Sequence, residues 1–414
     1  MKKITLLVCA LLACLMHGMA QDFVSTEVQN RNVIIEEFTG RNCGYCPDGH
    51  LIANNIVAAN PDRVWAVNVH AGGYAPTSYP NFNTTVSSQI LNAFNVSSFP
   101  SGVVNRTTAA GISRGEWQSY TNQQLSQTAE CNVAGQAIIN PVTRTAKINV
   151  EVYYTSNSAE SSNYLTIVML QDSIWGSQSG GSANPSQYVN GQYCHMHILR
   201  DAITPTWGDQ ISPTTAGTLI TKEYIYQIPE SIGSPNGVEV DLDNILFLAY
   251  VTEKQQGSAT RPVLNANELH SLQGSEEALY PFISTLNPAS GISCSETRDF
   301  SIGVTNGGLD ELTSLKFKAY VDGEFVKEQV WEGELASYAA TVINMEIDVP
   351  GGTHNVEIKI VEANGSSYES NKAMNFTFDE WDQVEIEGEE EELTIEIMQD
   401  KYGNQITWEL IGSD

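Results

Sequence analysis

The stretch EEFTGRNCGYCPDGH, residues 36–50, places Cys43 and Cys46 two residues apart, after a strand-like apolar run and before a helix-like one. A position at the start of a helix would stabilise the Cys43 thiolate, because unsatisfied N–H groups and the positive end of the helix dipole lie there. Cys46 would lie one turn further along and could close a disulfide with Cys43. The stretch therefore predicts a strand–loop–helix unit with a dithiol site at its junction.

Segments of strand and helix character alternate along the first part of the chain. They read, in order, NVIIEEF, DGHLIANNIVAAN, RVWAVNVH, SQILNAF, SGVVN and GEWQSYTNQQLSQ. Strands separated by helices are typical of a layered α/β domain. We therefore predict an α/β domain over residues 21–130.

Helix-like patterns disappear after Cys131. Short alternating strands between Ser-, Gly-, Asn- and Pro-rich turns predict a β-sandwich over residues 131–275 and a second one over residues 290–378. Residues 379–392 read as an acidic linker kept open by self-repulsion. Residues 393–414 read as a β-hairpin about the turn DKYGN, either docked on a neighbouring sheet edge or beginning a further, truncated domain.

The first twenty residues have the features of a secretory signal. Lys2 and Lys3 precede the apolar run ITLLVCALLACLM, and HGMA ends at Ala20. A segment of this length is too short to span a membrane, so we predict cleavage after Ala20 and export of the mature chain. The alternative is lipidation at Cys14, within LLAC, which would anchor the chain to a membrane.

The chain is strongly acidic. Lys and Arg number 20 against 49 Asp and Glu, a formal charge of −29, which becomes −31 (18 − 49) once Lys2 and Lys3 leave with the signal. Nucleic acids and anionic membrane surfaces repel such a protein, so we predict neither as a direct partner. The sequence contains no phosphate loop, dinucleotide fingerprint or G-x-S-x-G nucleophile motif, and we predict no cofactor.

Five cysteines remain after the signal, which fits an oxidising compartment. Three uses stay open for the Cys43–Cys46 pair: thiol–disulfide exchange, a permanent disulfide, or zinc binding. Zinc would need a second pair, and the later cysteines lack that spacing. Cys131 and Cys194 are predicted either to form a disulfide or to be two buried free thiols, with Cys294 unpaired.

Two histidine positions invite a functional interpretation. In CHMH, residues 194–197, a strand would place Cys194 and Met196 on one face and both histidines on the other, so one ion could not bind all four without a bend. We predict a buried/exposed alternation there and no metal. His50 follows Cys46 by about one turn, and it is predicted either as an exposed helical side chain or as a group that tunes the thiols.

The stretch EEFTGRNCGYC resembles the thioredoxin superfamily, and FNVSSFPSGVVN looks like the cis-proline loop of that superfamily. The resemblance implies that Cys43 is the attacking thiol, Cys46 the resolving thiol and Glu37 the proton acceptor for Cys46. It also implies a cis peptide bond before Pro100, which would face Cys43. Asn42 replaces the aromatic residue that usually precedes the first cysteine.

A larger resemblance covers roughly residues 20–270. The signal, VIIEEFTGRNCGYCPDGH, FPSGVVNR and YCHMHILRDAITPTWGD look like the Omp-28-kDa-related outer membrane proteins of Bacteroidetes. This implies an exported protein of the periplasm, the outer membrane or the cell surface of a Gram-negative bacterium. The later block, from VTNGG to VEANGSSYESN, resembles bacterial cell-adhesion-related immunoglobulin-like modules.

Together, these patterns predict a thioredoxin-like α/β domain, two all-β immunoglobulin-like sandwiches and a C-terminal β-hairpin. Two functions remain open. One is a surface-associated thiol–disulfide oxidoreductase that acts on protein thiols and disulfides through Cys43, Cys46, Glu37 and Pro100. The other is an adhesion or scaffold protein that binds cell-surface proteins and whose first domain has no redox turnover.

Overall fold

The computed structural model describes residues 23–253, 261–275, 277–288 and 297–378. Four predicted features lie outside these residues: the signal with Cys14, the thiol of Cys294, the acidic linker 379–392 and the hairpin 393–414. None of the described helices has the length and apolarity that a membrane crossing requires.

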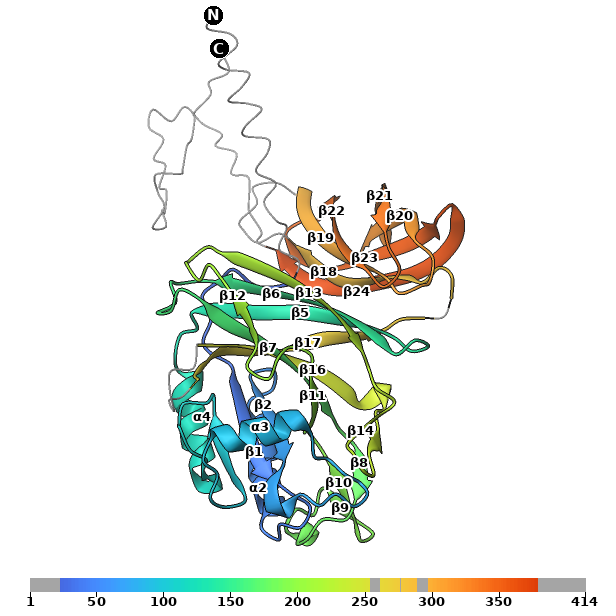
Figure 1. Cartoon of the computed structure of the whole chain (residues 1–414). Coiled ribbons are helices and arrows are strands. Elements are labelled where there is room, and N and C mark those ends of the chain that lie inside the picture. The colour runs from blue at the N-terminus through green and yellow to red at the C-terminus, as the bar shows by residue number, and fades with distance from the viewer. Residues whose placement is uncertain (1–22, 254–260, 276, 289–296, 379–414) are drawn as a thin grey trace, which may run out of the picture.

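The Cys43–Cys46 pair lies in a layer of helices around two buried parallel strands (Figure 1). The elements of this layer are β1 (Val33–Thr39), α2 (Cys46–Ala59), β2 (Val64–His70), η1 (Gly72–Tyr74), α3 (Thr85–Ala93), β3 (Ser101–Val104), β4 (Ile112–Ser113), η2 (Arg114–Glu116) and α4 (Trp117–Leu125). Strand β1 is buried throughout because α2 and α4 cover one face and α3 the other. Ile35 packs toward α2 and α4, whereas Ile34 packs toward α3. Burying each such side chain contributes about 1.5–3 kcal/mol.

The sheet of this layer continues into the next part of the chain. Further strands are β5 (Cys131–Asn140), β6 (Thr145–Tyr154), β7 (Asn163–Gln171), β11 (Ile198–Ala202), β12 (Asp209–Ile211), β13 (Leu219–Gln227), β16 (Ile245–Thr252) and β17 (Val263–Gln273). Together with β1, β2, β3 and β4, these eight strands form one twelve-stranded mixed sheet. Its order is β13-β6-β5-β17-β16-β7-β11-β2-β1-β3-β4, and β12 pairs with β7. The join is the parallel pairing of β11 with β2, where Ile198 lies opposite Asn68. Asn68 strengthens the join, because its side-chain amide donates to the Met196 carbonyl at 2.7 Å.

The predicted fold class is wrong. The described part of the chain is mostly β-structure with three α-helices, and its main element is the large mixed sheet rather than a thioredoxin-like α/β domain followed by immunoglobulin-like sandwiches. The physical reason is that segments assigned to separate domains share one sheet and one core. Val67 and Val69 of β2 pack in the same cluster as Val168 of β7 and Leu199 of β11. Local periodicity predicts that a segment is extended, but it does not say which strand will pair with it.

Smaller elements occur in the sequence between β7 and β16 and project from the sheet. They are β8 (Ile174–Gly176), η3 (Gly181–Ala183), β9 (Tyr188–Val189), β10 (Gln192–His195), β14 (Ser231–Ile232), β15 (Val238–Glu239) and η4 (Leu242–Asn244). Strand β10 pairs with β8 on one side and β9 on the other. In Figure 1, β8, β9 and β10 lie at the same end of the molecule as the start of α2.

The last described part of the chain consists of two further sheets around one core (Figure 1, orange to red). The first contains β18 (Pro281–Pro288), β19 (Thr297–Asn306) and β22 (Ala340–Asp348), and the second contains β20 (Leu312–Val321), β21 (Glu324–Leu335), β23 (Gly352–Ala363) and β24 (Ser366–Phe378). Phe300 of the first sheet and Phe317 of the second are fully buried between them. Residues 281–378 therefore form two packed sheets, apart from the gap at 289–296.

Candidate functional site

Cys43 and Cys46 form a disulfide at the start of α2, with their Cα atoms 5.4 Å apart. The Cys43 N–H donates to the Gly40 carbonyl at 3.0 Å and closes a tight turn, and α2 begins at Cys46 with Pro47 in its first turn. The predicted pairing and the predicted helix start are therefore confirmed. Both cysteines are buried: the side chain of Cys43 is 2% exposed and that of Cys46 is 0% exposed.

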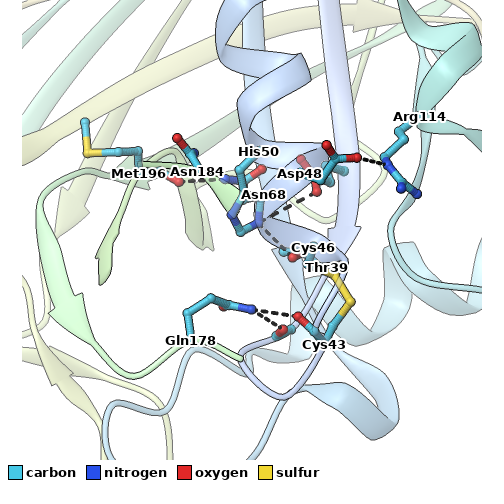
Figure 2. A network of polar contacts seen from close by, with 12 residues as sticks. Thr39, Cys43, Cys46, Asp48, His50, Asn68, Arg114, Gln178, Asn184 and Met196 are labelled. Carbon is cyan, nitrogen blue, oxygen red and sulfur yellow. Dashed lines mark hydrogen bonds and ion pairs between the residues drawn. A yellow bond between two sulfur atoms is a disulfide. The ribbon is translucent and has the colours of Figure 1, made fainter. Parts of the chain in front are cut away.

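Cys43 is buried because residues 177–187, which we call the cover segment, lie against it. The Gln178 side-chain amide donates to the Cys43 carbonyl at 2.9 Å, a contact visible in Figure 2. Gly180 has a φ of +69°, and a side chain there would collide with the backbone of Gly44. The cover segment therefore contacts the disulfide loop backbone to backbone, and a reagent can reach Cys43 only when this contact opens.

Arg41 joins the cover segment to a second loop on the other side of the site. Its guanidinium donates to the Ser177 hydroxyl at 2.6 Å and to the Ser78 carbonyl at 2.7 Å, and its own carbonyl accepts from the Ser179 N–H at 2.8 Å. Burial lowers the pKa of Arg41, and no carboxylate within the described ranges forms an ion pair with it. Arg41 therefore acts as a cross-link between two loops through neutral acceptors.

Glu37 of β1 lies beneath the face of α2 that carries Cys46. On a helix, Cys46, Gly49 and His50 share one face, and a Cβ atom at Gly49 would be 2.5 Å from Glu37 Oε1 and 3.0 Å from the Pro100 ring. Neither carboxylate oxygen has a hydrogen-bond partner among the described residues. Burial raises the pKa of Glu37 well above its ordinary value, which favours the protonated form of this carboxyl.

The peptide bond between Phe99 and Pro100 is cis, as predicted. Because a Cβ atom at Gly49 would be 3.0 Å from the Pro100 ring, Pro100 lies beside the helix face above Glu37. Asp48, on the same first turn of α2, forms an ion pair with Arg114 (Figure 2). The charge of Arg114 opposes the effect of burial on Glu37, but it is the smaller of the two influences on that pKa.

Three buried histidines, which we call the histidine cluster, lie behind the site: His50, His70 and His195. His50 Nε2 is 2.8 Å from the Thr39 hydroxyl, and His50 Nδ1 is 2.8 Å from the Tyr193 hydroxyl. The rings of His70 and His195 lie 5.7 Å apart, and none of their nitrogens makes a hydrogen bond of normal geometry within the described part of the chain. Burial lowers the pKa of His50 and of His195 to about 3, and it lowers the pKa of His70 well below 6.5.

Sequence reasoning missed several residues of this site. His50 is buried rather than exposed, and Gln178 and Tyr193 approach it from a segment assigned to another domain. The CHMH alternation is partly seen: His195 is buried, and the sulfurs of Cys194 and Met196 lie 3.8 Å apart on one side. No group of metal-ligating side chains occurs among the residues that the structure describes. Cys194 is a free thiol.

Cys131 is the second free thiol, and it is fully buried. The predicted disulfide between Cys131 and Cys194 is therefore wrong, and the alternative of free thiols holds, although Cys194 is only partly buried. Burial raises the pKa of both thiols, which makes them poor nucleophiles. The dithiol chemistry of the described chain is thus confined to Cys43 and Cys46.

Comparison with known protein families gives a match to part of the chain. The model of the family described as "Outer membrane protein Omp28" matches residues 87–267. Among solved structures, HBP35 of Porphyromonas gingivalis is similar at 15% identity and a TM-score of 0.47, over 83% of this chain and 98% of that one. An Agrobacterium tumefaciens protein has 8% identity and a TM-score of 0.36, over 61% of this chain and 96% of that one. No curated protein matches the chain.

The family match confirms the predicted resemblance to the Omp28 proteins. The description of this family as an outer membrane protein agrees with the predicted export to the periplasm, the outer membrane or the cell surface.

Proposed function

We propose that this protein, which matches the Omp28 outer membrane protein family over residues 87–267, exchanges its Cys43–Cys46 disulfide with the thiols of other exported proteins. The observation that carries the proposal is the closed disulfide at the start of α2 with the buried Glu37 carboxyl, whose pKa burial raises, beneath the helix face of Cys46. A disulfide that served only as a staple would gain nothing from a buried carboxyl without hydrogen bonds, whose burial is costly.

The exchange proceeds in two steps that balance protons and electrons. A substrate thiolate attacks Cys43 Sγ, the bond between the two cysteines breaks, and Cys46 leaves as a thiolate that takes the proton of Glu37. A second substrate thiolate then attacks the substrate sulfur of the mixed disulfide, and Cys43 leaves as a thiolate that takes up a proton from solvent. The substrate loses two electrons, the protein gains them as a dithiol, and the reverse sequence reduces a substrate disulfide.

The residue roles follow from the helix geometry. Cys43 precedes α2 and is the cysteine that the cover segment shields, so it becomes accessible when that segment moves. Cys46 faces the interior and the Glu37 carboxyl, so it resolves or leaves but does not meet substrate. Positive charge at the helix start stabilises the thiolate in either role.

Trapping of mixed disulfides tests the proposal. Cys46→Ser should accumulate mixed disulfides between Cys43 and exported proteins, because the resolving thiol is gone. Cys43→Ser is the matched control and should trap nothing. Glu37→Gln should slow the step that moves a proton to or from Cys46. If Cys46→Ser traps no partner under conditions where a control oxidoreductase does, the exchange function is excluded.

A second candidate is a surface adhesion or scaffold protein in which the disulfide is permanent. The burial of both cysteines, 2% and 0% exposed, favours it. This candidate predicts that neither cysteine variant traps a partner and that both variants bind cell-surface proteins as the wild-type protein does. The trapping experiment therefore separates the two functions.

A further inference from the structure

We propose that His50 and Tyr193 form a proton relay that connects the buried carboxyl of Glu37 to the cover segment, and this inference rests on the proposed exchange function. Glu37 must lose and regain a proton in every cycle, yet its side chain is fully buried. A buried acid of this kind needs a route to solvent. The described chain offers one through groups from β1, α2 and β10.

The route is a row of polar atoms. Glu37 Oε1 lies 3.7 Å from His50 Nε2, and His50 Nδ1 lies 2.8 Å from the Tyr193 hydroxyl. The Tyr193 hydroxyl donates to Gln187 Oε1 at 3.1 Å and accepts from the Asn184 amide at 3.1 Å. Gln187 belongs to the cover segment and is buried, at 7% exposure. When the cover segment moves, water can reach Tyr193.

The chemistry of each group suits proton transfer. Neutral imidazole accepts a proton at one nitrogen while it releases one from the other. The 3.7 Å gap to Glu37 closes to hydrogen-bond length with a shift of about 1 Å. Burial raises the pKa of Tyr193, so a free tyrosinate does not accumulate and the transfers along the row are concerted.

One cycle of the relay leaves its members unchanged apart from the imidazole tautomer. As Glu37 protonates the leaving Cys46 thiolate, His50 Nε2–H donates its proton to the Glu37 carboxylate. The Tyr193 hydroxyl turns from Gln187 toward His50, His50 Nδ1 takes the hydroxyl proton, and Tyr193 takes a proton from water at the cover segment. In the opposite direction each proton moves back, and no oxidant or reductant is required beyond the protein thiols of the exchange itself.

Other titratable groups near the relay do not offer a route of this kind. Facing Glu37 or His50 are the charged and titratable side chains of Asp48, Arg114, His70, His195 and His197. Asp48 and Arg114 are paired with each other, so they influence the relay only through their charge. Among the described residues, His50 is the one whose ring lies between the Glu37 carboxyl and the Tyr193 hydroxyl, and its Nε2 also lies 2.8 Å from the Thr39 hydroxyl.

The test measures how fast dithiothreitol opens the disulfide in the full chain, in variants with and without Glu37. His50→Gln and Tyr193→Phe should each slow opening about a hundredfold at equal dithiothreitol thiolate concentration, the lower end of the range for general acid catalysis. His195→Gln, the matched control, replaces a buried histidine outside the row and should change the rate less than threefold. In a Glu37→Gln background, His50→Gln and Tyr193→Phe should change it no more than twofold, because the group that the relay serves is gone.

The relay is refuted if His50→Gln slows opening equally with and without Glu37, since a packing defect would act in both backgrounds. It is also refuted if His50→Gln matches His195→Gln. Tyr193→Phe removes only a hydroxyl, so it keeps the test decisive if the histidine variant folds poorly. Failure of the proposed function is a different outcome: Cys46→Ser would trap no exported protein, whatever dithiothreitol does.

Discussion

The cover segment makes a sharp prediction at Gly180. A Cβ atom there would be 2.9 Å from the Gly44 carbonyl carbon and 3.1 Å from its Cα, tighter than the 3.4 Å at which ordinary contacts begin, and closer still to the Gly44 oxygen. Both sides of the contact are backbone, so no rotamer change can relieve it. Gly180→Ala should therefore force the cover segment away from the disulfide loop. The left-handed φ of +69° adds about 1–2 kcal/mol of strain to the covered state.

A destabilisation of about 1–2 kcal/mol raises the open population about five- to thirtyfold, since 1.4 kcal/mol corresponds to a factor of ten. The rate at which dithiothreitol reduces Cys43–Cys46 should rise by that factor, measured by quenched thiol labelling and mass spectrometry. Gly191→Ala is the matched control: its φ is +82°, but no described atom lies within 4 Å of the added Cβ. It should leave the rate within twofold of wild type. Equal rates for the two variants, with native circular dichroism, would refute the role of the cover segment.

Three further outcomes follow from buried contacts. Gly49→Ala should lower the free energy of unfolding by about 1–3 kcal/mol in denaturant titrations, despite the better helix propensity of Ala, because its Cβ collides with Glu37. Arg106→Met should cost about 3–5 kcal/mol because it strands Glu36, which accepts two hydrogen bonds from Arg106, and adding Glu36→Gln should recover part of the loss. The pKa values of the histidine cluster are lowered in the folded state, so the unfolded chain binds more protons and stability is lost as pH falls below about 6.5. The pKa of Glu37 is raised in the folded state, so the folded protein binds one proton that the unfolded chain does not, and this offsets one histidine. The free energy of unfolding should therefore fall by about 2 kcal/mol between pH 6 and 5. His195→Phe should reduce that loss by about 1 kcal/mol, and an unchanged slope would contradict the assignment.

The core of the site could be predicted from local sequence. The spacing of Cys43 and Cys46, the following proline and the later Phe99–Pro100 pair each act over a few residues, and the structure has the disulfide, the helix start and the cis bond. Gln178 and Tyr193 could not be found in this way, because they reach the site from more than 130 positions away. The stretch QSGGSANPSQ around Gly180 has the composition of a plain turn-rich loop. Its glycine is needed only because another backbone lies against it.

The prediction of the fold was wrong for a related reason. Alternation within TAKINVEVYYT or RVWAVNVH shows that each is extended and which side chains are buried together, and both segments are strands. Neither pattern records that β2 would pair with β11, a contact fixed by a single register pair and by Asn68. When a single sheet joins strands from distant parts of the sequence in this way, the local pattern of each segment still predicts two independent domains.

The pairing of β2 with β11 also limits how the protein can be dissected. A fragment that ended near residue 130 would keep both cysteines, but it would lose β11 and leave the polar backbone edge of β2 unsatisfied beside bared Val67 and Val69. It would also lose the cover segment and Tyr193. The smallest fragment suitable for truncation or grafting of the disulfide motif is therefore residues 23–275. Residues 21–130, which look like a separate domain in the sequence, depend on the strands that follow them.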